Sequence, residues 1–386
     1  MKVLTLGWLS VFLYIFLMNL YIWNRYWSIP FVSLRLLKVS TYLVIQVILV
    51  LLTLYYFYLF FNGKAEIPHA KPLSYVAAFY LTILHYSFIF YLIHDVVNLS
   101  SRHIAYPLRL RVFGGTLFYG GFLIFLIASG IALYGMHNAQ KVVIKNYEIT
   151  VPQKESSLEK LEIVYVSDAH FGTSVNRDNL DLLVETIEKM EGDILLLGGD
   201  FFDEGTSLAS KKIVSQALAR IDTPLGIVAI EGNHEYKSGQ DNIDEELAFL
   251  AQAGITTLQD EIIEIEDLFY IIGRKDPEGD PIALETLLGQ TTKDLPIIVL
   301  DHRPSYKESA ILPQVDLQLS GHTHSGQFFP MKYIEPLTMT FFKQTIYGHH
   351  QIGNLEHIVS SGVGNWGIPV RIGSKRELLK ITVHLQ

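Results

Sequence analysis

Four long apolar runs occupy the first 140 residues of the chain, and they limit what this part can fold into. They are Val3–Trp23, Val39–Phe61, Leu73–Val97 and Phe113–Tyr134. Each run is close to the roughly 20 residues that an α-helix needs to cross a bilayer. A cleaved signal peptide does not explain the first run, because its apolar stretch is too long and no small-residue cleavage site follows it. The sequence therefore predicts a multi-pass protein of the cell membrane, with four spanning helices over residues 1–140.

Charge divides the chain at the same place as hydrophobicity. Before residue 141 there are nine Lys and Arg residues and only two acidic residues, Glu66 and Asp95. That part carries +7, so the overall net charge of −9 leaves −16 for the rest of the chain. An acidic half without a basic stretch argues against a nucleic acid as the partner.

The basic residues between the predicted spans indicate an orientation. Cytoplasmic loops are enriched in Lys and Arg. The second loop holds Lys64 and Lys71, partly offset by Glu66. The first and third loops hold more of them: Arg25, Arg35, Lys38, Arg102, Arg109 and Arg111. We expect loops one and three to be cytoplasmic, so that both termini and the acidic half are extracytoplasmic.

A second kind of organisation begins after the last apolar run. Residues 141–160 are typical of one strand, Lys141–Val151, followed by a polar linker. From Leu161 onward, short apolar runs alternate with amphipathic stretches, which indicates a buried and largely parallel sheet with covering helices. We therefore expect a membrane domain over 1–140, a strand and linker over 141–160, and an α/β catalytic domain over 161–386.

Five short clusters of His, Asp and Asn each follow an apolar run of this α/β domain. They are Asp168-Ala-His170, Gly199-Asp200-Phe-Phe-Asp203, Gly232-Asn233-His234-Glu235, Asp301-His302 and Gly321-His322-Thr-His324. One such cluster alone is weak evidence, since turns after strands favour Gly, Asn and Asp for backbone reasons. Five clusters at the carboxyl ends of strands, where ligands bind in parallel sheets, predict a shared site.

The donors in these clusters are nitrogen and oxygen atoms, which suit Mn, Fe, Zn or Mg better than a thiolate site would. They are also more numerous than one ion can use. We therefore predict two adjacent divalent metal ions. Such a pair clamps a phosphoryl group and lowers the pKa of a bound water, which favours a metal-dependent hydrolase of phosphoric esters.

In their order, the motifs D-x-H, G-D-x-x-D, G-N-H-E, H and G-H-x-H resemble those of the calcineurin-like metallophosphoesterase superfamily. The match covers roughly residues 142–386. The phrases around Asp200 and His322 and the segment Gly362–Arg371 are similar to a membrane-anchored bacterial branch. Multi-span proteins described as transmembrane proteins with a metallophosphoesterase domain look similar in plan. Ser325 departs from this branch, which usually has glycine there.

The resemblance implies a four-layer α/β/β/α sandwich with a dinuclear metal centre. It assigns Asp168, His170 and His324 to one metal, Asn233, His302 and His322 to the other, and Asp200 to both as a bridge. It also implies that His234 protonates the leaving oxygen or stabilises the transition-state charge instead of binding metal. Asp203 and Glu235 are expected to orient ligands or to make structural hydrogen bonds.

Two further regions have open alternatives. Trp366 and Arg371 are candidates to contact phosphate and substrate, and packing near the site is the other interpretation. The stretch after the last cluster is unusually apolar, and either a second-sheet core or a lipid-facing lip explains it. Its apolar residues are Phe328, Phe329, Met331, Tyr333, Ile334, Phe341 and Phe342.

We therefore predict a membrane-bound phosphatase or phosphodiesterase that hydrolyses phosphoester or pyrophosphate bonds, with manganese among the suitable metals. Its location beside a bilayer makes a lipid or lipid-linked phosphate the leading substrate, and a phosphorylated small molecule is the other. The alternative is a catalytically weak membrane protein that keeps the metallophosphoesterase fold for binding or regulation. The complete set of predicted ligands favours the enzyme, because degenerate members of the family typically lose metal ligands.

Overall fold

The computed structural model describes most of the chain in two compact units. The described residues are 12–22, 35–62, 64, 66–101, 122–171, 177–203, 206–237, 240–334 and 344–386. One unit comprises Met1–Phe61 and Ile67–His137, and the other comprises Asn62–Glu66 and Asn138–Gln386. Of the basic residues used to predict orientation, Arg25, Arg102, Arg109 and Arg111 lie outside the described residues.

The described part of the first unit consists mainly of apolar helices. Its helices are α2 (Arg35–Phe61), α3 (Ala70–Ser101), most of α5 (Phe122–Asn138) and a shorter helix over Phe12–Ile22. Two stretches within them are long and apolar enough to cross a membrane, Leu43–Phe61 and Ala70–Val97. The first and fourth predicted spans are represented, within the described residues, only by shorter apolar helices. Two candidate spans are therefore found, and the predicted four-helix domain is not confirmed.

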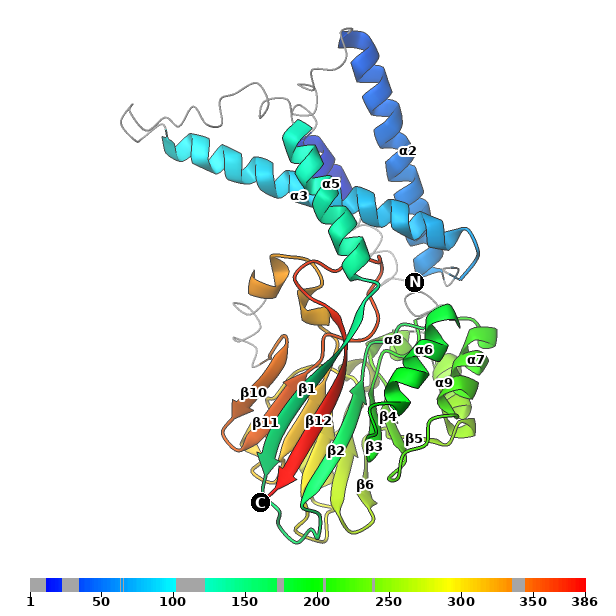
Figure 1. Cartoon of the computed structure of the whole chain (residues 1–386), viewed down its shortest axis with the longest axis vertical. Coiled ribbons are helices and arrows are strands. Elements are labelled where there is room, and N and C mark those ends of the chain that lie inside the picture. The colour runs from blue at the N-terminus through cyan, green and yellow to red at the C-terminus, as the bar shows by residue number, and fades with distance from the viewer. Residues whose placement is uncertain are drawn as a thin grey trace. The chain divides into compact units, whose positions relative to one another are not determined.

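The second unit contains two six-stranded sheets, and their strands carry the predicted clusters (Figure 1). The first sheet has the order β1-β12-β2-β3-β4-β5. Its strands are β1 (Val142–Val151), β2 (Lys160–Val166), β3 (Ile194–Gly198), β4 (Ile227–Ile230), β5 (Ile255–Thr257) and β12 (Arg376–Leu385). The second has the order β10-β11-β9-β8-β7-β6. Its strands are β6 (Glu261–Ile265), β7 (Phe269–Gly273), β8 (Ile297–Leu300), β9 (Leu317–Ser320), β10 (Gly348–Ile352) and β11 (Leu355–Val359).

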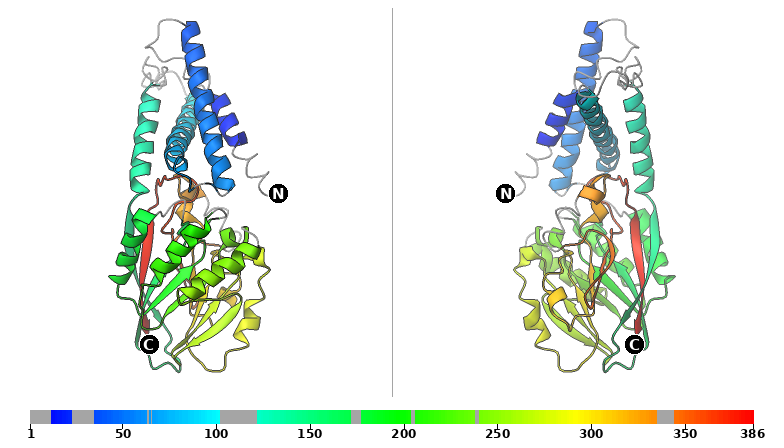
Figure 2. Two further views of the ribbon diagram at one scale, coloured as in Figure 1. Left: turned by 90° about the vertical axis from the view of Figure 1, so that its right-hand side faces the viewer. Right: turned by 90° about the vertical axis from the view of Figure 1, so that its left-hand side faces the viewer.

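Apolar side chains on both faces of the strands explain why the sheets form layers. Successive side chains of a strand point to opposite faces. In β2, Ile163 and Tyr165 pack into the core between the two sheets, whereas Val164 and Val166 pack into a second core beneath helices. Figure 2 shows the two sheets of this unit lying against each other. Strands buried on both faces are continuous apolar runs, which is how the sequence revealed them.

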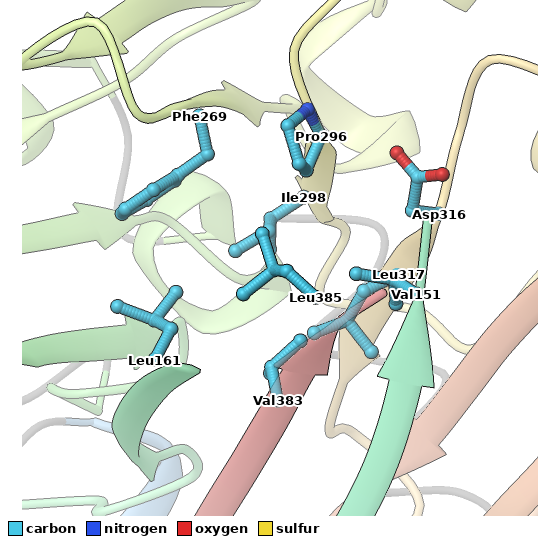
Figure 3. Close-up of a pocket in the computed structure, with 9 residues that line it drawn as sticks. All are labelled: Val151, Leu161, Phe269, Pro296, Ile298, Asp316, Leu317, Val383 and Leu385. Atoms are coloured by element: carbon cyan, nitrogen blue, oxygen red, sulfur yellow. The ribbon is translucent and has the colours of Figure 1, made fainter. Parts of the chain in front are cut away.

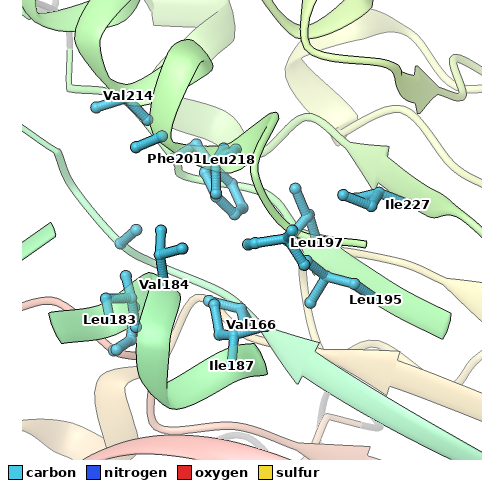
Figure 4. Close-up of a cluster of buried hydrophobic side chains, with 14 of the residues drawn as sticks. Val166, Leu183, Val184, Ile187, Leu195, Leu197, Phe201, Val214, Leu218 and Ile227 are labelled. Atoms are coloured by element: carbon cyan, nitrogen blue, oxygen red, sulfur yellow. The ribbon is translucent and has the colours of Figure 1, made fainter. Parts of the chain in front are cut away.

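Helices cover the outer face of each sheet. On the first sheet these are α6 (Arg177–Glu188), α7 (Leu208–Leu218) and α9 (Gln240–Gln252). Figure 4 shows Val184 of α6 and Leu218 of α7 packed with Leu197 of β3. On the second sheet, α10 (Leu284–Leu288) and a short 3-10 helix (Ser309–Ile311) lie over a smaller apolar cluster. The helix–sheet–sheet–helix order agrees with the layers that the resemblance implies.

One predicted boundary is wrong. Residues 141–160 were expected to form a strand and linker outside the catalytic domain, but β1 pairs in parallel with β12 over its whole length, from Val142 opposite Arg376 to Val151 opposite Leu385. The segment is therefore an edge strand of the catalytic sheet. Local alternation identifies such a strand, but it does not identify a partner that is distant in sequence.

The core between the sheets is tightly filled at one end. Figure 3 shows side chains from both sheets there, among them Leu161, Phe269 and Leu385. They enclose a cavity of about 10 Å³, roughly the space of one water molecule. This end of the sandwich has no room for a substrate.

Helices α7 and α9 are joined by a buried ion pair, whose contribution to stability can be tested by mutation. Lys211 Nζ lies 2.7 Å from Glu246 Oε1, and the side chains are 4% and 2% exposed. Removing one partner of a buried pair costs roughly 3–5 kcal/mol, whereas replacing both with apolar residues costs far less. We expect Lys211→Met to lower the midpoint of thermal unfolding in detergent, measured by circular dichroism. Lys211→Met combined with Glu246→Leu should recover most of the loss, and a single variant as stable as the parent would contradict this interpretation.

Candidate metal centre

The five predicted clusters lie at the carboxyl ends of strands in both sheets. Asp168 and His170 follow β2, Asp200 follows β3, and Asn233 begins helix α8 (Asn233–Lys237) directly after β4. In the second sheet His302 follows β8, and the last cluster follows β9. Strands β2, β3 and β4 are mutually parallel, as are β8 and β9, so each sheet delivers its clusters to one edge.

The first group of donors consists of Asp168, His170 and His324, all buried and with donor atoms within 4.8 Å of one another. The Nε2 atoms of His170 and His324 are 3.1 Å apart, and His324 Nε2 is 3.6 Å from Asp168 Oδ1. Behind His170, its Nδ1 lies 2.7 Å from Asp203 Oδ1. A carboxylate accepts from Nδ1–H in that geometry, which leaves the Nε2 lone pair facing the group.

The second group consists of Asp200, His302 and His322. His302 Nδ1 lies 2.8 Å from the carbonyl oxygen of Gly198, to which it donates. Its Nε2 lies 3.1 Å from Asp200 Oδ2, in an orientation that gives no hydrogen bond. Nearby Asn233 Oδ1 is likewise buried without a hydrogen-bond partner.

These unpartnered atoms test whether the residues fit metal ions. A buried polar atom without a partner is costly, and native structures leave few of them. Here Asn233 Oδ1 is an acceptor that a cation would satisfy, and His302 Nε2 is a ligand atom that a cation could bind in place of a proton. The donors are carboxylate, imidazole and amide groups, which suit borderline-to-hard divalent ions. The residues present therefore fit divalent metal ions.

The charges around the site change the pKa values of the candidate ligands. Burial alone would raise the pKa of Asp200, but His302 and His234 hold it well below its usual range. In return, the Asp200 carboxylate outweighs burial and raises the pKa of His302 to about 10, so an entering metal ion would displace a proton from this ring. Burial, and then the charge of Arg371, hold the pKa of His324 well below its usual value, so that ring is neutral.

Glycines precede several donors because no side chain fits there. A Cβ at Gly232 would lie 2.3 Å from Asp200 Oδ1, and one at Gly321 would lie 2.3 Å from Asp168 Oδ2. Both distances are far below a van der Waals contact. The glycines of the G-N-H-E and G-H-x-H motifs thus allow a backbone to pass directly against a carboxylate.

The backbone at the site is strained in a way that the sequence did not reveal. Five of the predicted ligands have positive φ: Asp168 (53°), His170 (47°), Asp200 (52°), His322 (71°) and His324 (49°). Residues other than glycine rarely adopt this region, and each costs about 1–3 kcal/mol. Such strain persists where surrounding contacts over-determine the geometry, and it is concentrated at functional sites.

Glu235 makes some of the contacts that hold this strained backbone in place. Its carboxylate accepts hydrogen bonds from the backbone N–H groups of Asp200, Phe201, Phe202 and Gly232, at 2.7–3.1 Å. It therefore fixes the turn after β3 against the turn after β4. This geometry agrees with the structural hydrogen-bonding role expected for Glu235, as the bond to His170 does for Asp203.

His234 lies between the two groups. Its Nε2 is 4.0 Å from Asp200 Oδ2 and its Nδ1 is 3.8 Å from Asp203 Oδ1. The side chain is 7% exposed, and its ring is 5.0 Å from that of His170. By distance His234 also belongs to a third possible donor group with His170 and Asp203, so position alone does not separate an acid from a ligand.

The two candidates for substrate contact, Trp366 and Arg371, differ in their exposure to solvent. Trp366 is 47% exposed, and its backbone N–H donates to Gln327 Oε1. Arg371 is 0% exposed, and its guanidinium is directed at backbone carbonyls of the surrounding loops. The buried guanidinium of Arg371 agrees with the second interpretation, packing beside the site.

The apolar stretch after the last cluster is also corrected. A second-sheet core was one interpretation, but Met331–Ile334 is helical and outside both sheets. Phe329, Tyr333 and Ile334 are 45%, 64% and 48% exposed. Phe341 and Phe342 lie outside the described residues. We call Phe329, Tyr333 and Ile334 the apolar lip.

Comparisons with known proteins find similar metallophosphoesterases. The family model described as calcineurin-like phosphoesterase matches residues 161–326. A transmembrane protein with metallophosphoesterase domain from Bos taurus is 29% identical over 276 residues, which are 66% of this chain and 60% of that protein. An uncharacterized metallophosphoesterase from Aquifex aeolicus is 32% identical over 248 residues, or 62% of this chain and 91% of that protein. The crystal structure of a Thermus thermophilus protein, TT1561, aligns with a TM-score of 0.36 and 15% identity, covering 52% of this chain and 89% of that one.

The position of Asp200 between the groups leads to a prediction about metal content. We expect Asp200→Asn to lose most bound metal, measured by elemental analysis of the purified protein, because the substitution removes the negative charge 3.1 Å from His302. Asp203→Asn is the matched control, since it removes a charge that contacts His170 Nδ1 from behind. Its metal affinity should fall by only about 10–100-fold. Parental metal content in Asp200→Asn would show that Asp200 does not bind metal.

Proposed function

We propose, since this chain belongs to the calcineurin-like metallophosphoesterase family, that it is a membrane-bound, dinuclear-metal hydrolase of phosphoester or pyrophosphate bonds. One observation carries the proposal: carboxylate and imidazole donors from both sheets converge, and His302 Nε2 and Asn233 Oδ1 are buried without hydrogen-bond partners. The family binds divalent metals, and the donor set here is complete.

The residues would divide the work as the motifs imply. Asp168, His170 and His324 would hold one ion, Asn233, His302 and His322 the other, and Asp200 would contact both. When bound, two divalent ions stabilise the charge on a transferring phosphoryl group and lower the pKa of a water. The chain itself keeps His324 neutral and Asp200 ionised, and it fixes the ring of His170 through Asp203.

His234 would serve the leaving group. Its backbone N–H donates to Asp200 Oδ1 at 2.9 Å, and its ring nitrogens Nε2 and Nδ1 are 4.0 Å from Asp200 Oδ2 and 3.8 Å from Asp203 Oδ1. A histidine at this position can hold a proton at the ring nitrogen that faces the site and pass it to a leaving oxygen. Its small residual exposure, 7%, suits a group that meets substrate at the mouth of the site.

A lipid or lipid-linked phosphate is the substrate class that we favour. Two stretches, Leu43–Phe61 and Ala70–Val97, are suited to crossing a membrane. The apolar lip begins five residues after His324 in the chain and exposes three large apolar side chains. Exposed apolar surface next to a catalytic loop suits contact with lipid. The alternative, a catalytically weak binding or regulatory protein, is disfavoured by the complete donor set.

Hydrolysis by the purified full-length protein tests this proposal. With Mn²⁺ we expect turnover of phosphomonoester, phosphodiester or pyrophosphate substrates within a panel that includes phospholipids and lipid-linked pyrophosphates. EDTA should abolish turnover, and added metal should restore it. A protein that binds metal but hydrolyses no member of the panel would favour the binding or regulatory alternative.

His234→Ala is the catalytic control for that assay. Its turnover should fall by roughly 10²–10⁴-fold, the usual contribution of general acid–base catalysis, with metal content unchanged. The loss should shrink for nitrophenyl esters, whose leaving group needs no proton. If the variant instead lost metal as Asp200→Asn does, His234 would be a ligand.

The extracytoplasmic placement of the catalytic half is a further proposal, supported by the basic residues predicted for loops one and three. Lys and Arg are costly to translocate, so these loops should stay in the cytoplasm. An alkaline phosphatase reporter, active only outside the cytoplasm, should therefore be active when fused after Gln386. A silent reporter, with the catalytic half protected from added protease, would place the catalytic half inside and leave its chemistry unaffected.

A further inference from the structure

Arg371 is the largest fully buried side chain among the described residues. Arginine is almost never fully buried unless it is paired. The contacts of this guanidinium are with neutral acceptors: the carbonyls of His324, Ser361, Gly364 and Lys375, the side chains of Asn365 and Ser374, and His324 Nδ1. A buried cation whose hydrogen bonds go to neutral groups calls for a local explanation.

Its contacts with His324 give such a reason. Arg371 Nη1 donates to the carbonyl oxygen of His324 at 3.1 Å, and Nη2 lies 3.1 Å from Nδ1 of the same residue. The guanidinium therefore touches both the backbone and the ring of His324, from the side opposite Asp168 and His170. His324 and Ser325 both have positive φ, 49° and 52°, and such a backbone needs external support.

The loop that carries Arg371 is itself fastened to the start of the catalytic unit. Asn138 Nδ2 donates to the carbonyls of Arg371 and Ser374, at 3.0 and 2.9 Å. One residue on, the carbonyl of Ala139 accepts from Asn365 Nδ2 and Arg376 Nη1, at 3.3 and 3.2 Å. Asn365 Oδ1 in turn accepts from Arg371 Nε. Residues 138–139 and the guanidinium of Arg371 thus belong to one continuous hydrogen-bond network.

We propose that Arg371 is a positioning residue for the metal centre and that Asn138 acts through it. Through the carbonyl oxygen of His324, Arg371 fixes the left-handed backbone that holds this residue beside Asp168 and His170. Asn138 fixes the backbone of Arg371. Neither residue touches substrate. The inference rests on the proposed function in one respect only, that His324 binds a metal ion.

Cobalt binding to the full-length protein tests the proposal without substrate. Co²⁺ gives a visible spectrum that reports its coordination, and calorimetry gives the affinity and number of ions. Arg371→Lys keeps a positive charge but loses the bidentate fork. We expect one Co²⁺ to bind about 10–100-fold more weakly, with an altered spectrum, as for removal of a group that orients a ligand. The second ion should bind as in the parent.

Arg274→Lys is the matched control. Arg274 is a buried arginine of the same unit, and it donates to Glu308 Oε2 and to the carbonyl of Ile282, outside the network around Arg371. Its variant should bind both ions with parental affinity and spectrum, even where thermal stability falls. If Arg371→Lys binds both ions like the parent, or if Arg274→Lys loses the same ion, Arg371 has only a structural role.

Asn138→Ala supplies a milder second variant, because it leaves the arginine in place. It should weaken the same ion as Arg371→Lys, to a smaller extent, while Asn146→Ala on the exposed side of β1 should have no effect. Parental Co²⁺ binding in Asn138→Ala would remove Asn138 from the proposal. Since every measurement here is of metal binding, a protein inactive on all substrates would overturn the proposed function and leave this test intact.

Discussion

The buried contact between Asp200 and the imidazoles around it is the interaction on which the rest of this site depends. A carboxylate that is only 2% exposed is stable as an anion only if positive groups surround it. His302 from the second sheet and His234 from the first supply that environment. Glu235 holds the turn that presents Asp200, through backbone N–H groups on two loops. The two sheets are thus joined at their functional edge by charge, and elsewhere by apolar packing.

Sequence patterns were sufficient for the parts of the site that depend on local order. Asp168, Asp200 and Asn233 each follow a short apolar run, and parallel strands necessarily bring such positions to one edge. The motif order then implied which donors share an ion, and the structure groups Asp168 with His170 and His324, and Asp200 with His302 and His322. The left-handed backbone at these residues had no sequence signal, because it results from contacts made by distant loops.

Other errors arose where sequence cannot distinguish exposed from buried. Tyr333 and Ile334 are as apolar as core residues, yet they are exposed, whereas Arg371 is charged and fully buried. The hydrophobicity of a side chain sets the free-energy cost of exposing or burying it. Whether the side chain is in fact exposed or buried depends on its tertiary contacts. The same holds for the apolar runs of the first 140 residues. Length and composition alone identify Leu43–Phe61 and Ala70–Val97 as candidate membrane spans.

The position of β12 between β1 and β2 has a consequence for biosynthesis. β12 is the last strand of the catalytic unit in chain order, yet it lies inside the first sheet. All the metal-ligand candidates therefore leave the ribosome before the sheet that supports them can close. Arg371 lies just before β12. A nascent chain that already contains every ligand therefore still lacks Arg371, which contacts His324, and β12, which joins β1 to the sheet. Metal binding with the affinity of the finished protein is then expected only after translation of the whole unit, which would limit metal capture by incomplete chains.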